Sequence, residues 1–231
     1  MSEPDRVRER YARRQTSGKD ALWRFLEPSV LLAAQEKERA LARWISSCHI
    51  QPITERRVLE VGCGTGDDLL EYIRLGFAPE HLAGCELLED RAETARHRLP
   101  AATTVVCGDA SAADFEEESF DIVAQSTVFT SLLNDEFQQQ LADRMWALAR
   151  PGGGILWYDF IYDNPQNPDV RGVPASRVRE LFAGGEFRSW KVTLAPPIGR
   201  RLARIHPLAY SVANWLSPLR IARLCWIAKP H

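Results

Sequence analysis

The sequence predicts an α/β fold in which a mostly parallel sheet carries helices on both faces. Three observations predict this fold. Short apolar runs alternate with helical patterns between residues 57 and 162, as expected for strand–helix–strand units. The first run, RVLEV at 57–61, leads into a glycine-rich loop and then into a helix. The 231 residues, 45% of them hydrophobic, suffice for one domain with a substantial core.

The expected elements follow in chain order. Strands are predicted at 57–61, 81–87, 103–107, 120–125 and 154–162, with helices at 67–75, 89–98 and 135–149. A helix near 175–183, a strand at 189–195, a short helix near 208–216 and a strand at 223–229 follow. No long amphipathic crossover connects the last two predicted strands, so we expect them to lie antiparallel at one edge of the sheet. Helical patterns at 3–16 and about 31–45 predict an N-terminal extension over 1–50, ahead of a sheet domain over 51–231.

The composition narrows the possible partners and the compartment. A formal net charge of -2 disfavours nucleic acid as a substrate. The five cysteines form no CxxC pair, which predicts buried free thiols and no structural zinc, and no other metal is expected. The first residues lack a secretory apolar segment, and no run of eighteen apolar residues occurs. We therefore expect a soluble, cytoplasmic protein.

The glycine loop follows the first predicted strand in VLEVGCGTGDD at 58–68. Its spacing is GxGxG, whereas a dinucleotide-binding loop would read GxGxxG with a third glycine where Asp67 stands. Glu60 and Asp67 place negative charge beside the loop, which would oppose a diphosphate by roughly a kcal/mol per close pair. The loop therefore favours a cationic ligand.

Polar residues also end the following predicted strands. Glu86 ends the second, where an acid can accept both hydroxyls of a ribose. Asp109 follows the third, and Gln125 with Ser126 ends the fourth. Any one acid is as readily a helix cap or a solvated turn, but acids at successive strand ends favour a cofactor site at one edge of the sheet.

These segments resemble a known family. VLEVGCGTG, CEL, VVCGDA, FDIVAQSTVF and ALARPGGGILWYDF resemble the ordered motifs of class I S-adenosylmethionine-dependent methyltransferases across 57–161. The resemblance implies a Rossmann-like sheet of seven strands with an antiparallel last strand, S-adenosylmethionine as donor and S-adenosylhomocysteine as product. QSTVFTSLLND and WYDFIYDNPQNPDVRGV resemble small bacterial methyltransferases of surface-polysaccharide and lipopolysaccharide assembly.

The resemblance also implies roles for individual residues. The methionine part of the donor would meet Glu60, Gly62, Cys63, Gly64, Gly66 and Asp67. The ribose would meet Glu86 and Leu87, the adenine Asp109 and Ala110, and the methyl group would lie above Gln125 and Ser126.

Acceptor contacts are expected from the loops after the fourth and fifth strands, at Thr127, Phe129, Thr130, Tyr162, Asp163, Asn164, Asn167 and Arg171. Asp159 is the first choice for a general base, with capping or pairing to an arginine as its alternative role. The stretch 163–172 either bonds sugar hydroxyls or makes turns, and turns are the simpler interpretation. The N-terminal helix is either a lid, with Tyr11 or Arg14 meeting the donor carboxylate, or a frayed terminus.

The sequence leaves several functions open. The leading hypothesis is O-methylation of a sugar or glycan for the bacterial surface, and its rival within the fold is methylation of a small metabolite or natural product. An NAD-dependent oxidoreductase and a donor-binding protein without turnover are the alternatives of other classes. Arginines at 200, 201, 204, 220 and 223, near Trp215 and Leu216, either contact an anionic membrane surface or form a solvated face; the solvated face is favoured.

Overall fold

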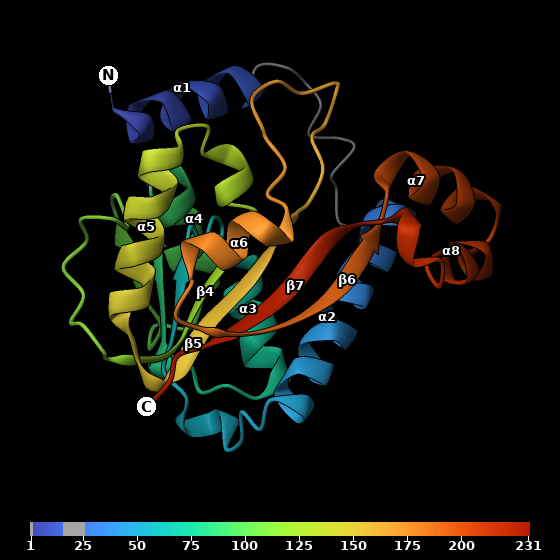
Figure 1. Cartoon of the computed structure of the whole chain (residues 1–231). Helices are drawn as coiled ribbons and strands as arrows, with labels where there is room; N and C mark the ends of the chain where they lie inside the picture. Colours follow the sequence, from blue (N-terminus) through green and yellow to red (C-terminus); the bar gives the residue numbers. More distant parts are fainter. Residues whose placement is uncertain (1, 16–25) are drawn as a thin grey trace.

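The computed structural model describes residues 2–15 and 26–231. Within them the chain forms a seven-stranded sheet in the order β3-β2-β1-β4-β5-β7-β6, with helices on both faces (Figure 1). The parallel strands are β1 (Val58–Val61), β2 (Leu82–Glu86), β3 (Thr104–Cys107), β4 (Phe120–Ser126) and β5 (Ala149–Phe160). The predicted α/β class and the mostly parallel sheet are confirmed.

Strand β1 lies at the centre of the sheet. It pairs in parallel with β2 on one side and β4 on the other, and its four residues are all buried. The chain order of the strands reverses at β1 and β4, and open α/β sheets bind ligands in the crevice that this reversal leaves at the carboxyl ends. The glycine loop leaves β1 at this crevice.

The helices complete two cores, one on each face of the sheet. One core includes residues of α5 (Asp135–Leu148) and α6 (Ala175–Leu181), and the other residues of α2 (Pro28–Ser47), α3 (Asp67–Leu75) and α4 (Glu89–Arg98). Trp44 of α2 is fully buried, with its ring centroid 5.5 Å from that of Trp226. Helix α2 is therefore packed into the sheet's core, while α1 (Glu3–Gln15) lies across the carboxyl end of the sheet (Figure 1).

The last strand is inserted between its two predecessors. Strand β7 (Arg220–Ala228) pairs antiparallel with both β5 and β6 (Glu186–Leu194), which confirms the predicted antiparallel last strand. Between β6 and β7 the sequence predicted one short helix, but the structure has two, α7 (Pro196–Ile205) and α8 (Pro207–Ala213). His206 is extended between them, because the residue before a proline is held out of the helical region.

Strand β5 begins at Ala149, earlier than the expected residue 154. The residues ARPGGG, which join the predicted helix to the predicted strand, form the first part of β5. An added Cβ on Gly154 would collide with the backbone carbonyl of Ile227 on β7, so the close approach of the two strands requires glycine there.

The described residues also bear on whether the chain has membrane-spanning helices, disulfides or metal sites. No helix in the described part of the chain is long and apolar enough to cross a membrane. All five cysteines are free, with Cys63, Cys85 and Cys225 buried. Among residues 2–15 and 26–231, no three His, Cys, Asp or Glu side chains gather into a site for a metal ion.

Candidate active site

A cavity of about 120 Å³ lies at the carboxyl ends of β1, β2, β3 and β4 and beneath α1. The strand ends, the glycine loop and the helix above supply its walls. Of the residues that the sequence assigned to the donor or the acceptor, the cavity brings together Tyr11, Gly62, Glu86, Leu87, Asp109, Ala110, Ser126 and Thr127. Residues from five separate segments of the chain thus share one site, as the strand-end argument predicted.

Glu86 fixes the glycine loop as well as facing the cavity. Its Oε2 accepts from the Gly64 amide at 2.8 Å, and its Oε1 accepts from the Leu88 amide at 2.9 Å. The side chain is thus held in one position at the cavity wall. Each carboxylate oxygen can accept a further hydrogen bond, so the carboxylate remains able to bind a pair of hydroxyls.

The amides of the glycine loop are already engaged inside the protein. The amides of Gly62 and Cys63 both donate to the Cys85 carbonyl, at 2.8 and 3.1 Å, and the Gly64 amide donates to Glu86. A diphosphate site needs backbone amides pointing at the ligand. The loop therefore offers three fewer donors to a phosphate than its glycine pattern suggests.

Arg91 closes one side of the cavity and was not singled out from the sequence. An added Cβ on Gly64 would lie 2.6 Å from the Arg91 Nη2 atom, so glycine makes room for the guanidinium. The same guanidinium lies 5.2 Å from the centroid of the Tyr11 ring, a cation–π contact that joins α4 to α1. Only this tertiary contact identifies Arg91, since its place in a charged helix carries no signal.

A second polar cluster lies behind the cavity wall. Lys37 of α2 donates to Asp68 Oδ2 at 2.6 Å and to the hydroxyl of Ser126, a cavity residue, at 2.9 Å. The Tyr72 hydroxyl donates to Glu60 Oε2 at 3.0 Å, while Glu60 Oε1 is buried and has no hydrogen-bond partner among the residues that the structure describes. We call these five residues the Lys37 cluster.

The electrostatics of the Lys37 cluster differ from the expectation of a charged acid beside the loop. Burial and then the neighbouring Asp68 charge raise the pKa of Glu60 to about 8, so Glu60 is mostly protonated at neutral pH. Burial is the largest influence on Lys37 and would lower its pKa, but Asp68, Tyr158 and Glu60 together outweigh burial, so the pKa is raised. A Lys37–Asp68 ion pair therefore lies beside a mostly neutral Glu60. No motif in the sequence identified Lys37.

Asp67 requires a correction. Its side chain is 70% exposed and pairs with Arg98 at 2.7 Å, so it does not place an unbalanced charge at the loop. The first-turn acid that is linked to the cavity wall is Asp68, which pairs with Lys37 behind Ser126, because successive helical residues point about 100° apart.

Gln125 and Asp159 also differ from their expected positions. The Gln125 amide bonds to the backbone of Tyr158 and Val128, and the Asp159 carboxylate accepts from the amides of Thr130 at 3.1 Å and Phe160 at 2.9 Å. Asp159 is 1% exposed, and burial raises its pKa to about 7. Asp159 therefore holds the turn η4 (Phe129–Ser131) in place through the Thr130 amide. This corresponds to the capping alternative and not to the general base.

Several proposed acceptor residues serve the scaffold instead. Phe129 is fully buried against Trp157, with the ring centroids 4.4 Å apart, and Thr130 is buried. Asn164 and Asn167 accept from the amides two residues further on, which is the turn geometry that the sequence favoured. Tyr162 is 55% exposed and Arg171 pairs with Asp135. Thr127, with a positive φ of 59°, is the member of this group that lines the cavity.

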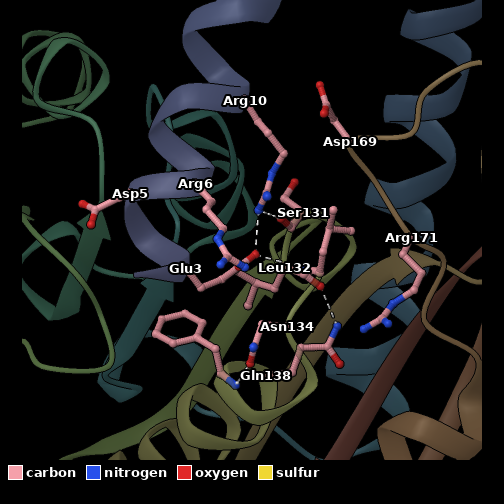
Figure 2. A network of polar contacts seen from close by, with 12 residues as sticks. Glu3, Asp5, Arg6, Arg10, Ser131, Leu132, Asn134, Gln138, Asp169 and Arg171 are labelled. Atoms are coloured by element: carbon pink, nitrogen blue, oxygen red, sulfur yellow. Dashed lines mark hydrogen bonds and ion pairs between the residues drawn. The ribbon is translucent and has the colours of Figure 1, made fainter. Parts of the chain in front are cut away.

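Helix α1 is docked over the cavity by a buried ion pair. Arg10 Nη2 lies 2.6 Å from Glu3 Oε1 and donates to the Ser131 carbonyl at 2.8 Å, while the same Glu3 oxygen accepts from the Leu133 amide at 3.0 Å (Figure 2). We call this arrangement the Glu3–Arg10 latch. The side chain of Arg14, the other expected contact to the donor carboxylate, lies outside the described residues. Pro4, Val7 and Tyr11 of α1 line the cavity.

Known proteins share both the sequence motifs and this fold. Residues 58–153 match a family model described as a methyltransferase domain. The sheet order, with β7 antiparallel between β5 and β6, is that of the class I methyltransferase fold. An S-adenosylmethionine-dependent methyltransferase from Mesorhizobium loti superposes with a TM-score of 0.60 at 14% identity, covering 83% of this chain and all of that one. A Haemonchus contortus phosphoethanolamine N-methyltransferase 2, solved with S-adenosylmethionine, also gives 0.60, at 19% identity, covering 84% of this chain and 52% of that one.

Sequence relatives of this methyltransferase domain act on unlike acceptors. A phthiotriol/phenolphthiotriol dimycocerosates methyltransferase of Mycobacterium ulcerans is 34% identical over 145 residues, 60% of this chain and 51% of the relative. A tRNA N(3)-cytidine methyltransferase of Gallus gallus is 29% identical over 112 residues, 45% of this chain and 30% of the relative. The chain thus spans about half of the length of the first relative and under a third of the second.

Proposed function

We propose that this chain transfers a methyl group from S-adenosylmethionine to an acceptor hydroxyl. The observation that carries the proposal is the position of Glu86, fixed at the cavity wall by two backbone amides beside the glycine loop. Asp109 lines the same cavity from the end of the next strand, with one oxygen engaged by the Ser111 amide. This is a site for a ribose and an adenine.

The described residues fit the rest of the donor. Glu60 Oε1 is a buried acceptor that lacks a hydrogen-bond donor, and an ammonium would supply one. The donor itself supplies an activated methyl group on a sulfonium. Apolar residues of α1 and of the α5 side, among them Val7, Leu132 and Phe137, line the same cavity and would exclude water from it.

The engaged loop amides count against the rival oxidoreductase function. A dinucleotide needs free amides for its pyrophosphate, whereas Gly62, Cys63 and Gly64 donate to groups within the protein. The Glu60 and Asp67 charges, which seemed to repel a diphosphate, contribute less, because the pKa of Glu60 is raised to about 8 and Asp67 is paired.

We propose a sugar or glycan hydroxyl of bacterial surface polysaccharide as the acceptor, on the resemblance in 125–135 and 157–173. A small metabolite is the rival. A third candidate is a lipid, because the Mycobacterium ulcerans relative at 34% identity is named for dimycocerosates. The hydroxyl's proton passes to solvent as the O–CH₃ bond forms and the S–CH₃ bond breaks, because the Asp159 carboxylate is occupied by backbone amides.

Two experiments test the function. Calorimetry should show that S-adenosylhomocysteine binds and NAD does not, and tight NAD binding without a response to S-adenosylhomocysteine would overturn the proposal. S-adenosylhomocysteine release should then be measured with purified sugar nucleotides, glycolipids, long-chain lipid alcohols and small phenols. Donor binding without release on any acceptor class would identify the donor-binding protein without turnover.

A further inference from the structure

The hairpin of α7 and α8 connects β6 to β7 at the same end of the sheet as the cavity. Leu194 at the end of β6 pairs with Arg220 at the start of β7, and Phe160, at the carboxyl end of β5, pairs with Ala222. The hairpin projects from this end of the molecule (Figure 1). A surface that binds the hairpin would therefore lie near the end of the sheet that holds the cavity.

Helix α8 is apolar on two sides. Its inner side packs Tyr210, which is 2% exposed, against α7 and the end of β6. The outer side carries Leu208 and Val212, and Trp215 and Leu216 continue the same helical spacing at the end of the helix. They are 57 to 83% exposed, and Ile205, just before α8, is 74% exposed. We call these five residues the outer apolar face.

A helix that is apolar all round is ordinarily buried in protein or in a membrane. The outer apolar face is not covered by other described residues. Large exposed apolar residues that gather in one place mark an interaction surface. Amphipathic surface helices with Trp and Leu on one side and Arg on the other lie in the membrane interface.

The charge of this part of the chain selects among partners. Residues 187–231 contain eight Lys and Arg residues and no Asp or Glu, so they carry a formal charge of +8, while the rest of the chain carries -10. Arg201 and Arg204 of α7 are exposed. Arg204 directly precedes Ile205 of the outer apolar face, and Arg201 lies one helical turn earlier in α7. The hairpin therefore combines apolar residues with positive charge, which matches an anionic lipid surface.

We propose that the α7–α8 hairpin docks this methyltransferase onto an anionic membrane surface, with the outer apolar face entering the headgroup region and Arg201 and Arg204 contacting lipid phosphates. A second copy of the chain would bring two segments of +8 together, and RNA would leave the apolar residues without a partner. The lipid surface satisfies both features. Docking goes beyond methyl transfer and does not depend on it.

Co-sedimentation with vesicles tests the proposal in the absence of donor and acceptor. Wild-type protein should sediment with vesicles of phosphatidylcholine and phosphatidylglycerol, and more weakly with phosphatidylcholine alone or at high salt. Leu208→Ser with Trp215→Ser should abolish sedimentation with both. Because both side chains are exposed, the double variant should unfold at the wild-type temperature.

A charge variant and a matched control complete the test. Arg201→Gln with Arg204→Gln should weaken binding to anionic vesicles by about 25-fold, at about fivefold for each arginine near the surface. Arg43→Gln with Arg179→Gln removes two exposed arginines from α2 and α6 and should leave binding near the wild-type value. Equal binding by the apolar variant and wild type would overturn the proposal. Two other results would also overturn it. One is a wild-type dimer that does not bind vesicles and that dissociates in the apolar variant. The other is RNA binding that is lost only in the charge variant.

Discussion

Removing Arg10 should release α1 from the cavity. In Arg10→Met the Glu3 carboxylate, 4% exposed, loses its nearer cation at 2.6 Å and keeps Arg6 at 3.9 Å, while the Ser131 carbonyl loses a donor at 2.8 Å. Removing one partner of a buried ion pair costs about 3–5 kcal/mol. The helix is terminal and can detach without unfolding the sheet, so the loss should appear as local opening and not as a large fall in global stability.

Because Arg6 remains near Glu3, the lower end of that range, about 3 kcal/mol, applies. If donor binding requires docked α1, the affinity then falls by at most about 150-fold. We expect hydrogen exchange to accelerate in residues 3–13 and affinity for S-adenosylhomocysteine to fall at least about tenfold within that bound. Glu3→Gln with Arg10→Met is the matched control. It keeps an acceptor for the Leu133 amide but buries no charge, so both measurements should recover toward wild type.

Two results would refute this reasoning. Rapid exchange in α1 with unchanged donor affinity would show that α1 is no lid for the donor. Unchanged exchange in Arg10→Met would show that the Glu3–Arg10 latch does not hold the helix. Deleting residues 1–18 provides an independent comparison, because a lid predicts a folded protein with weak donor binding and little turnover.

Three further predictions concern the site. Glu86→Ala should weaken S-adenosylhomocysteine binding by about 1–3 kcal/mol in calorimetry, because the ribose and the Gly64 amide both lose an acceptor; unchanged affinity would remove the ribose role. The pKa of Glu60 is raised from 4.5 to about 8, so the folded state binds more protons than the unfolded state between these values and the free energy of unfolding should fall as pH rises through them. Glu60→Gln should flatten that pH dependence in urea titrations. The ammonium of S-adenosylmethionine should lower the pKa of Glu60, so binding should release protons at neutral pH, and Glu60→Gln should abolish this release. An unaltered pH profile of stability would contradict both expectations. Asp159→Asn should lower the unfolding temperature while retaining most of kcat, whereas a loss of about 10²-fold or more in kcat with unchanged stability would restore Asp159 as the base.

Local sequence determined the parallel core of this protein. Helices α3 and α4 begin and end where the sequence placed them, at 67–75 and 89–98. Alternating apolar runs and periodic helices carry that information in neighbouring residues. The site residues found from sequence, such as Glu86 and Asp109, follow strands, and parallel strands end at one edge regardless of the packing above them.

Tertiary structure decided what lies across that edge. Lys37, Arg91 and the Glu3–Arg10 latch come from helices distant in sequence, and their residue types have no periodic or motif signal. Whether Asp67 or Asp68 joins the Lys37 cluster, and whether Asp159 meets an acceptor or an amide, depends on the direction of each side chain within its helix or strand. A pattern of polarity specifies which elements form, but contacts between them arise only when the sheet and its helices pack together.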